Sequence, residues 1–151
     1  MAHAHLPTTE AAVAAVREIA EEFGREVVVT HDVGADRTSR RTGVGSFAVT
    51  DPDGTLPHEA YLEMGGAPAV TVQLFAEGDA AIVVDGVEFR DVPRDSVPAF
   101  LRSVLGGLAF VRSRFFPPGQ RLLVPLPGDR TYSEPVPGFS LTPWLARSVR
   151  S

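Results

Sequence analysis

Two histidine–carboxylate pairs, His31-Asp32 and His58-Glu59, are the residues of this chain best suited to chemistry. Two imidazoles and two carboxylates brought together could bind zinc or perform acid–base catalysis. Adjacent residues of a β-strand point to opposite faces, so only one member of each pair could enter a shared site. No H-E-x-x-H spacing accompanies them. The pattern therefore favours solvated or hydrogen-bonded side chains, and the sequence predicts neither a metal site nor a cofactor.

Nucleophilic catalysis has few candidates in this sequence. Cysteine is absent and no G-x-S-x-G elbow occurs. The carboxylates of Asp51, Asp53, Glu59 and Glu63 fall at a turn and along one face of a predicted strand, where charged side chains ordinarily serve solubility. Neither a Walker-type loop nor a strand–G-x-G-x-x-G–helix motif is present to bind phosphate. These patterns argue against an enzyme.

Two groups of arginines form the third pattern. Arginine beside aromatic residues is typical of hot spots in protein interfaces, and equally of grooves that bind single-stranded nucleic acid. All 14 basic residues are arginines, and the chain carries 19 acidic residues. This acidic excess favours a protein partner over nucleic acid. The first group, Arg37, Arg40 and Arg41, lies in the polar segment 34–43; the second, Arg112, Arg114 and Arg121, flanks Phe115 and Phe116.

A helix followed by short strands must position these residues. Apolar residues recur at helical spacing after a threonine cap, which predicts a helix over Thr9–Phe23. Gly24 should end this helix, and residues 1–7 before it should be flexible. Segments of β-branched and alternating residues then recur about every ten positions, joined by tight turns. The turn at Asp85-Gly86 is the strongest hairpin signal, because a type I′ turn needs two positive φ angles. The pattern predicts an antiparallel meander of about six strands, over 25–33, 44–50, 58–64, 70–75, 80–84 and 87–92.

A second amphipathic helix is predicted over residues 95–114, packed on one face of the sheet. Gly106-Gly107 would lie in mid-helix, where we expect close approach by another backbone. The proline-rich segment that follows predicts one edge strand over 121–128 and an irregular stretch over 128–140. Thr142 should cap a last short helix, with Pro143 at its first position. The whole pattern predicts a single α+β domain over residues 1–151.

Charge and hydropathy indicate the cellular location in which such a domain would function. Residues 1–95 carry 17 acids and 7 arginines, a net charge of −10, whereas residues 96–151 carry 2 acids and 7 arginines, a net charge of +5. No apolar run reaches the length of about 18 residues that a membrane span needs, and the N-terminal residues lack the order of a signal peptide. Abundant Ala, Gly, Val and Pro, with no lysine, resemble the product of a GC-rich genome. We expect a protein of the bacterial cytoplasm that does not insert into membranes.

These observations favour a non-catalytic module that binds another protein, such as an immunity-type inhibitor or a secretion chaperone. The predicted docking surface is the exposed side of the sheet, which is acidic and has one aromatic anchor; a homodimer is also compatible with the sequence. The alternative is a small-molecule binder or enzyme with a pocket between the sheet and the helix at 95–114, where His31 and His58 would lie. The predicted partner-binding residues are Glu59, Tyr61, Glu63, Thr71 and Gln73, with Arg37, Arg40 and Arg41.

Overall fold

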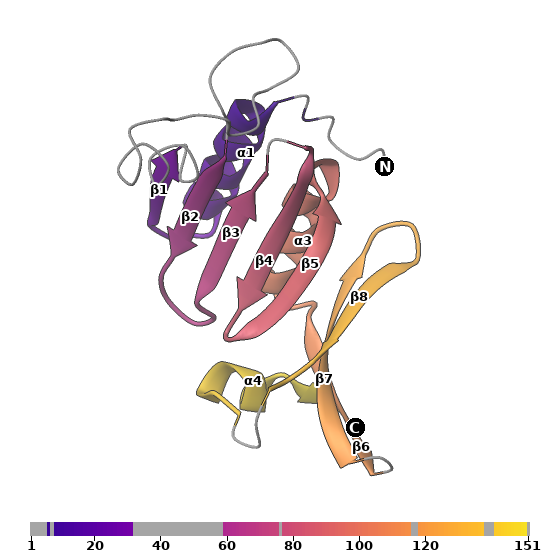
Figure 1. Ribbon diagram of the computed structural model, residues 1–151. Helices are drawn as coiled ribbons and strands as arrows, with labels where there is room; N and C mark the ends of the chain where they lie inside the picture. Colours follow the sequence, from indigo (N-terminus) through magenta and orange to yellow (C-terminus); the bar gives the residue numbers. More distant parts are fainter. Residues whose placement is uncertain are drawn as a thin grey trace, which may run out of the picture.

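A five-stranded antiparallel sheet with two helices on one face forms the larger part of the molecule (Figure 1). The computed structural model describes residues 6, 8–31, 59–75, 77–115, 118–137 and 141–150. The strands lie side by side in chain order, so the predicted meander and the α+β class are confirmed. The helices are α1 (Thr9–Glu22) and α3 (Val97–Leu105), and the strands are β1 (Val27–His31), β2 (Ala60–Met64), β3 (Val70–Leu74), β4 (Asp79–Val84) and β5 (Val87–Pro93).

Strict alternation of side chains explains why these segments form strands. In β2 and β3 every second residue is buried, and the register places buried Leu62 opposite buried Val72. Asp85 and Gly86 have φ angles of 47° and 88°, which confirms the predicted turn between β4 and β5. Five of the six predicted strands are present, and the remaining one, predicted over 44–50, lies outside the described residues.

Helix α1 begins and ends where its sequence predicts. The Thr8 Oγ1 accepts a hydrogen bond from the backbone N–H of Ala11 at 3.0 Å and so caps the first turn. Gly24, with a φ of 68°, terminates the helix in the left-handed conformation. The apolar stripe of α1 packs on the sheet, and its buried members are Ala12, Val13, Val16, Ile19 and Ala20.

The predicted helix over 95–114 is wrong in its second half. A single 3₁₀ turn, η1 (Arg94–Ser96), leads into α3, which ends at Leu105. Gly106 is the C-cap, and its N–H donates to the Arg102 carbonyl at 2.8 Å. Gly107 follows with a φ of 83°, a left-handed conformation that only glycine adopts without strain. The two glycines therefore stop the helix; they do not make room for another backbone.

Residues 110–135 form a second sheet where helix, edge strand and irregular chain were predicted. Strand β7 (Pro118–Leu126) pairs with antiparallel neighbours on both sides, so the expected edge strand is a central one. Strand β8 (Arg130–Pro135) occupies the stretch expected to be irregular. Burial alternates along β7, where Leu122, Val124 and Leu126 are buried, and its prolines lie at positions 118 and 125 near the ends of the strand. The remaining strands are β6 (Phe110–Phe115) and β9 (Val149–Arg150), which pair in parallel.

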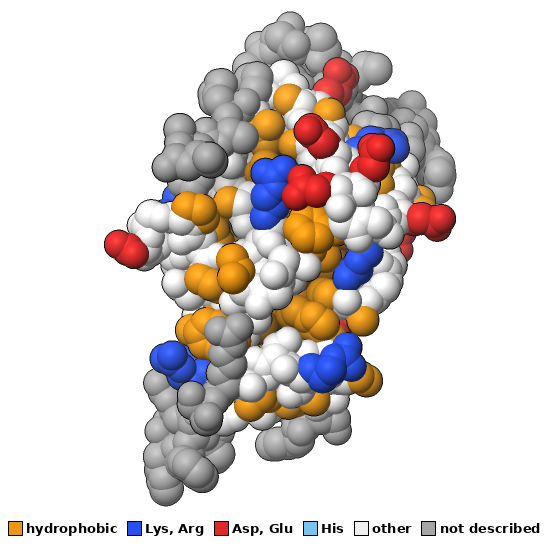
Figure 2. All heavy atoms as spheres, turned by 180° about the vertical axis from the view of Figure 1, so that it is seen from behind, with side chains coloured by type: hydrophobic (Ala, Val, Ile, Leu, Met, Phe, Trp, Pro, Cys, Tyr) orange, Lys and Arg blue, Asp and Glu red, His pale blue; other side chains and the backbone are white. Residues whose placement is uncertain are grey.

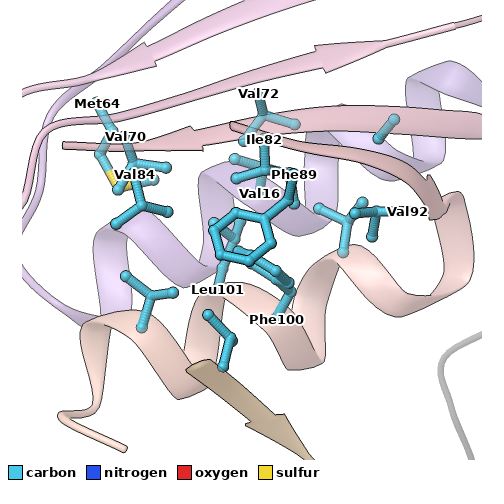
Figure 3. Close-up of a cluster of buried hydrophobic side chains, with 14 of the residues drawn as sticks. Val16, Met64, Val70, Val72, Ile82, Val84, Phe89, Val92, Phe100 and Leu101 are labelled. Carbon is cyan, nitrogen blue, oxygen red and sulfur yellow. The ribbon is translucent and has the colours of Figure 1, made fainter. Parts of the chain in front are cut away.

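One hydrophobic cluster extends through both sheets. Phe89 of β5 meets Phe100 of α3 edge-to-face, with ring centroids 5.0 Å apart (Figure 3). Phe100 also lies 5.7 Å from the ring of Tyr132 on β8. Burying such a phenylalanine contributes about 2 kcal/mol, so Phe100 is a principal link between the two layers. Leu122 and Val124 of β7, both fully buried, belong to the same cluster.

Polar contacts attach the two ends of the described chain to this frame. The predicted cap of helix α4 (Pro143–Arg147) is confirmed, since Thr142 Oγ1 accepts from the Leu145 N–H at 3.2 Å. The same hydroxyl donates to Asp85 Oδ2 at 2.6 Å. At the other end, Asp95 Oδ1 accepts from the Leu6 N–H at 2.7 Å. None of the helices in the described ranges has the length and apolar character that crossing a bilayer requires.

Candidate functional site

The face of the five-stranded sheet opposite α1 and α3 carries two rows of aligned side chains. This open face points toward the viewer in Figure 1, and no described helix or strand lies over it. Backbone register defines the rows, since directly paired residues project to the same side. The first row reads Val28, Glu63, Thr71, Val83 and Glu88, and the second reads Thr30, Tyr61, Gln73 and Ala81.

Four of the predicted partner-binding residues are neighbours on the open face. Tyr61 pairs with Gln73, and Glu63 pairs with Thr71, across β2 and β3. Tyr61 is half-buried and Glu63 is exposed, so the aromatic ring is supported by its neighbours while the carboxylate meets solvent. Glu59 comes immediately before β2, two residues from Tyr61. Strand pairing thus gathers these residues into one patch.

Carboxylates dominate the charge of the open face. Glu88 forms an ion pair with Arg90 at 3.1 Å, and the hydrogen bond that Arg90 donates to the Glu88 carboxylate, together with the negative charge of Glu88, raises the pKa of the Arg90 guanidinium. Both side chains are well exposed, so this pair contributes little stability. In the described part of the chain, no basic side chain is paired with Glu63. Its charge therefore remains available to a partner.

A groove of about 570 Å³ adjoins Glu63 at the corner of the sheet, lined by Gly24, Arg25, Glu26, Val28, Glu63, Gly65 and Gly66. The Arg25 guanidinium forms a fixed wall, because it donates to the carbonyls of Gly65 at 2.9 Å, Ala67 at 2.7 Å and Pro68 at 3.0 Å. Gly66 has a φ of 112°, which L side chains rarely adopt, and a Cβ there would also meet Arg25 Nη1 at 2.7 Å, so a substitution at this position would be strained. Val28, which is 64% exposed, supplies apolar surface beside the groove.

The other predicted residues are not brought together by the described structure. His31 is the last residue of β1, with its backbone opposite Ala60. His58 and the three arginines Arg37, Arg40 and Arg41 lie outside the described residues. Within the described ranges, no group of three or more His, Asp or Glu side chains is arranged to hold a metal ion.

The layer between the sheet and α3, where the alternative pocket was predicted, is filled by side chains. Phe89, Phe100 and Leu101 are each at most 1% exposed and interlock there (Figure 3). Interiors packed in this way are as dense as organic crystals. The groove at the sheet corner is therefore a better place for a ligand than this layer.

Val28 and Glu26 are surface residues of this region that the sequence pattern did not single out. The run Val27-Val28-Val29 contained the signal, since a strand with one covered face must direct every second residue outward. Val27 and Val29 are partly buried against the core, which leaves Val28 on the open face.

Comparison of the chain with protein-family models, with curated proteins and with solved structures finds no match. The geometry of the chain's own residues must therefore support any functional conclusion.

Proposed function

We propose that this protein is a non-catalytic module of the bacterial cytoplasm that binds another protein through the open face of its five-stranded sheet. One observation carries the proposal. Tyr61, Glu63, Thr71 and Gln73 occupy adjacent register positions on a face that no described element covers. An immunity-type inhibitor or a secretion chaperone would use such a surface.

The chemistry of the patch suits recognition of a protein. Tyrosine supplies a large, rigid contact at low entropic cost and is enriched among interface hot spots. Thr71 and Gln73 on the neighbouring strand β3 offer hydrogen-bonding groups beside it, and exposed Val28 adds apolar area in the same row as Glu63. Carboxylates at the rim would speed encounter with a basic partner more than they would increase affinity. The expected partner is therefore basic around an apolar centre.

Site-specific photo-crosslinking tests this proposal in cells of the source organism. A photoreactive amino acid at Gln73 should give a discrete crosslinked species, because this position is central on the open face. The same amino acid at Glu18, exposed on α1 on the other side of the sheet, should give none. The absence of a discrete product at position 73 would contradict the proposal.

A pair of substitutions then assigns the contact to named side chains. Tyr61→Ala combined with Glu63→Arg should abolish the crosslink, because it removes the anchor and reverses the rim charge. Truncating a tyrosine hot spot costs at least about 2 kcal/mol, roughly thirtyfold in affinity. Glu21→Arg on α1 reverses an exposed charge away from this face and should leave the crosslink intact. Equal loss in both variants would place the docking surface elsewhere.

A further inference from the structure

Two arginines of the second sheet lie directly opposite each other. Arg112 of β6 pairs with Arg121 of β7, and both side chains are exposed. The register continues to β9, where Arg150 is the partner of Arg112. Arg112 and Arg121 are the members of what we call the arginine row, which crosses the two adjacent strands β6 and β7. Like charges directly opposite on a sheet destabilise it, so this arrangement has an energetic cost.

Neighbouring groups fix the two described guanidinium groups in place. The Arg112 guanidinium lies 5.6 Å from the centroid of the Phe110 ring, within the range of a cation–π contact. Arg121 Nε donates to Ser133 Oγ at 2.8 Å, and its Nη2 donates to the Ser133 carbonyl at 3.0 Å. A guanidinium has five N–H donors, so three of those on Arg121 have no partner among the described residues.

No described carboxylate neutralises the arginine row. Residues 96–151 contain two acids: Asp129 lies in the turn between β7 and β8, and Glu134 pairs with fully buried Leu122, which places it on the opposite face of the sheet. Figure 2 shows that acidic and basic side chains are also separated on the helix side of the molecule. Acidic side chains gather in the upper half of this view, and the charged side chains at the lower end are almost all basic. Among the described residues, therefore, neither acid of this third of the chain lies beside the arginines of the row.

We propose that the arginine row is a docking site for a carboxylate-rich segment of a protein partner. Planar guanidinium groups bind carboxylates through two parallel hydrogen bonds, and the unused donors of Arg121 suit this geometry. Phe110 pairs with Leu123 in the next register row, and both are half-buried, so apolar contact is available beside the charges. The site differs from the open face in charge and location and takes a partner of opposite charge.

Charge favours a short acidic segment over a nucleic acid. A phosphate backbone carries its charge along its whole length, and binding it requires an extended basic surface. Here the basic row is short, and residues 1–95 carry a net charge of −10, which repels a long polyanion. A short acidic segment can contact the row without approaching that acidic part.

Fluorescence anisotropy with a labelled oligoglutamate peptide tests the proposal directly. The wild-type protein should bind the peptide at low salt and release it as salt rises. Arg112→Ala combined with Arg121→Ala should weaken binding about tenfold or more, because two charge-assisted contacts are lost. Arg130→Ala combined with Arg147→Ala removes the same charge from the same third of the chain outside the row, and should weaken binding less than about threefold.

Further measurements separate the competing occupants. The same titration with an oligothymidylate of equal length should show weaker binding than oligoglutamate. Tighter binding of the oligonucleotide, no binding of the peptide by the wild type, or equal losses in the two double variants would each overturn the proposal.

Sedimentation of the protein alone tests whether a second copy is the occupant. Self-association that both Arg112→Ala and Glu63→Arg abolish would assign the row to the acidic face of another copy. Unchanged thermal unfolding of the variants would show that binding, not folding, is affected.

Discussion

Asp85 joins three separate parts of the chain through one carboxylate. Its Oδ1 accepts from the Ala69 N–H at 2.7 Å, and its Oδ2 accepts from the Thr142 hydroxyl at 2.6 Å. The residue also adopts a φ of 47°, which aspartate tolerates better than most residues. The tight turn between β4 and β5 therefore positions both the entry to β3 and the start of α4.

Asp85→Ala should lower the free energy of unfolding by about 3 kcal/mol. About 1 kcal/mol reflects the left-handed backbone, and the two lost hydrogen bonds account for the rest at about 1 kcal/mol each. Asp129→Ala is the matched control: Asp129 has a φ of 59°, and its side chain makes no hydrogen bond within the described part of the chain. It should lose only about 1 kcal/mol. Urea denaturation of both variants measures the difference, and equal losses would contradict the role of the carboxylate.

The sequence predicts the turn at Asp85-Gly86 but not the partners of the carboxylate. A type I′ turn depends on two adjacent residues, so its signal is local. Ala69 and Thr142 lie 16 and 57 positions away, and only the assembled sheet brings them near. Tyr61 and Glu63 could be assigned to one face for the same local reason, because side-chain alternation needs no knowledge of distant residues.

At the scale of elements, the two glycines after α3 decide where helix becomes strand. The spacing of Val104, Leu108 and Val111 fits a continuous helix, yet the aromatic and β-branched residues within 110–115 suit a strand equally well. The positive φ of Gly107 resolves this ambiguity in favour of a stop. Because the arginine row depends on the register of β6 with β7, a helix prediction over these residues could not reveal it.

The direction in which one substitution changes the stability of the protein tests whether the helix ends at these glycines. Gly107→Ala should destabilise the protein by about 1 kcal/mol, because alanine would have to adopt a left-handed conformation. A glycine inside a continuous helix would behave in the opposite way, with alanine stabilising it by about 1 kcal/mol. Ala14→Gly on the exposed side of α1 provides a calibration, with an expected loss of about 1 kcal/mol. Thermal or urea unfolding that shows Gly107→Ala to be stabilising would contradict the stop.

For the molecule as a whole, Phe100 links the two sheets. Its ring contacts Phe89 in the five-stranded sheet and Tyr132 in the second sheet, and the side chain is fully buried. The sequence predicts Phe100 as part of an apolar helix stripe, but not that a second sheet would cover it. We expect the two layers to unfold as one cooperative unit.

Phe100→Ala should cost about 4 kcal/mol and destabilise both layers equally. The single tryptophan, Trp144 in α4, reports on the second layer by fluorescence. Amide exchange of β3 reports on the first. Coincident transitions in wild type and variant would support one unit, whereas a variant that loses the second layer alone would contradict it. Tyr132→Phe, which keeps the ring contact with Phe100, should change stability by less than about 1 kcal/mol.

The pairing of α1 with α3 has a consequence for the speed of folding. Arg102 of α3 reaches Glu22 of α1 at 3.0 Å over 80 positions, and Asp95 binds the Leu6 backbone over 89. Every strand of the meander lies between these partners in the chain. Helix α1 can therefore pack against α3 only after more than a hundred residues have left the ribosome. Contacts so distant in sequence raise the contact order of the fold, so we expect folding on a timescale of roughly milliseconds to seconds.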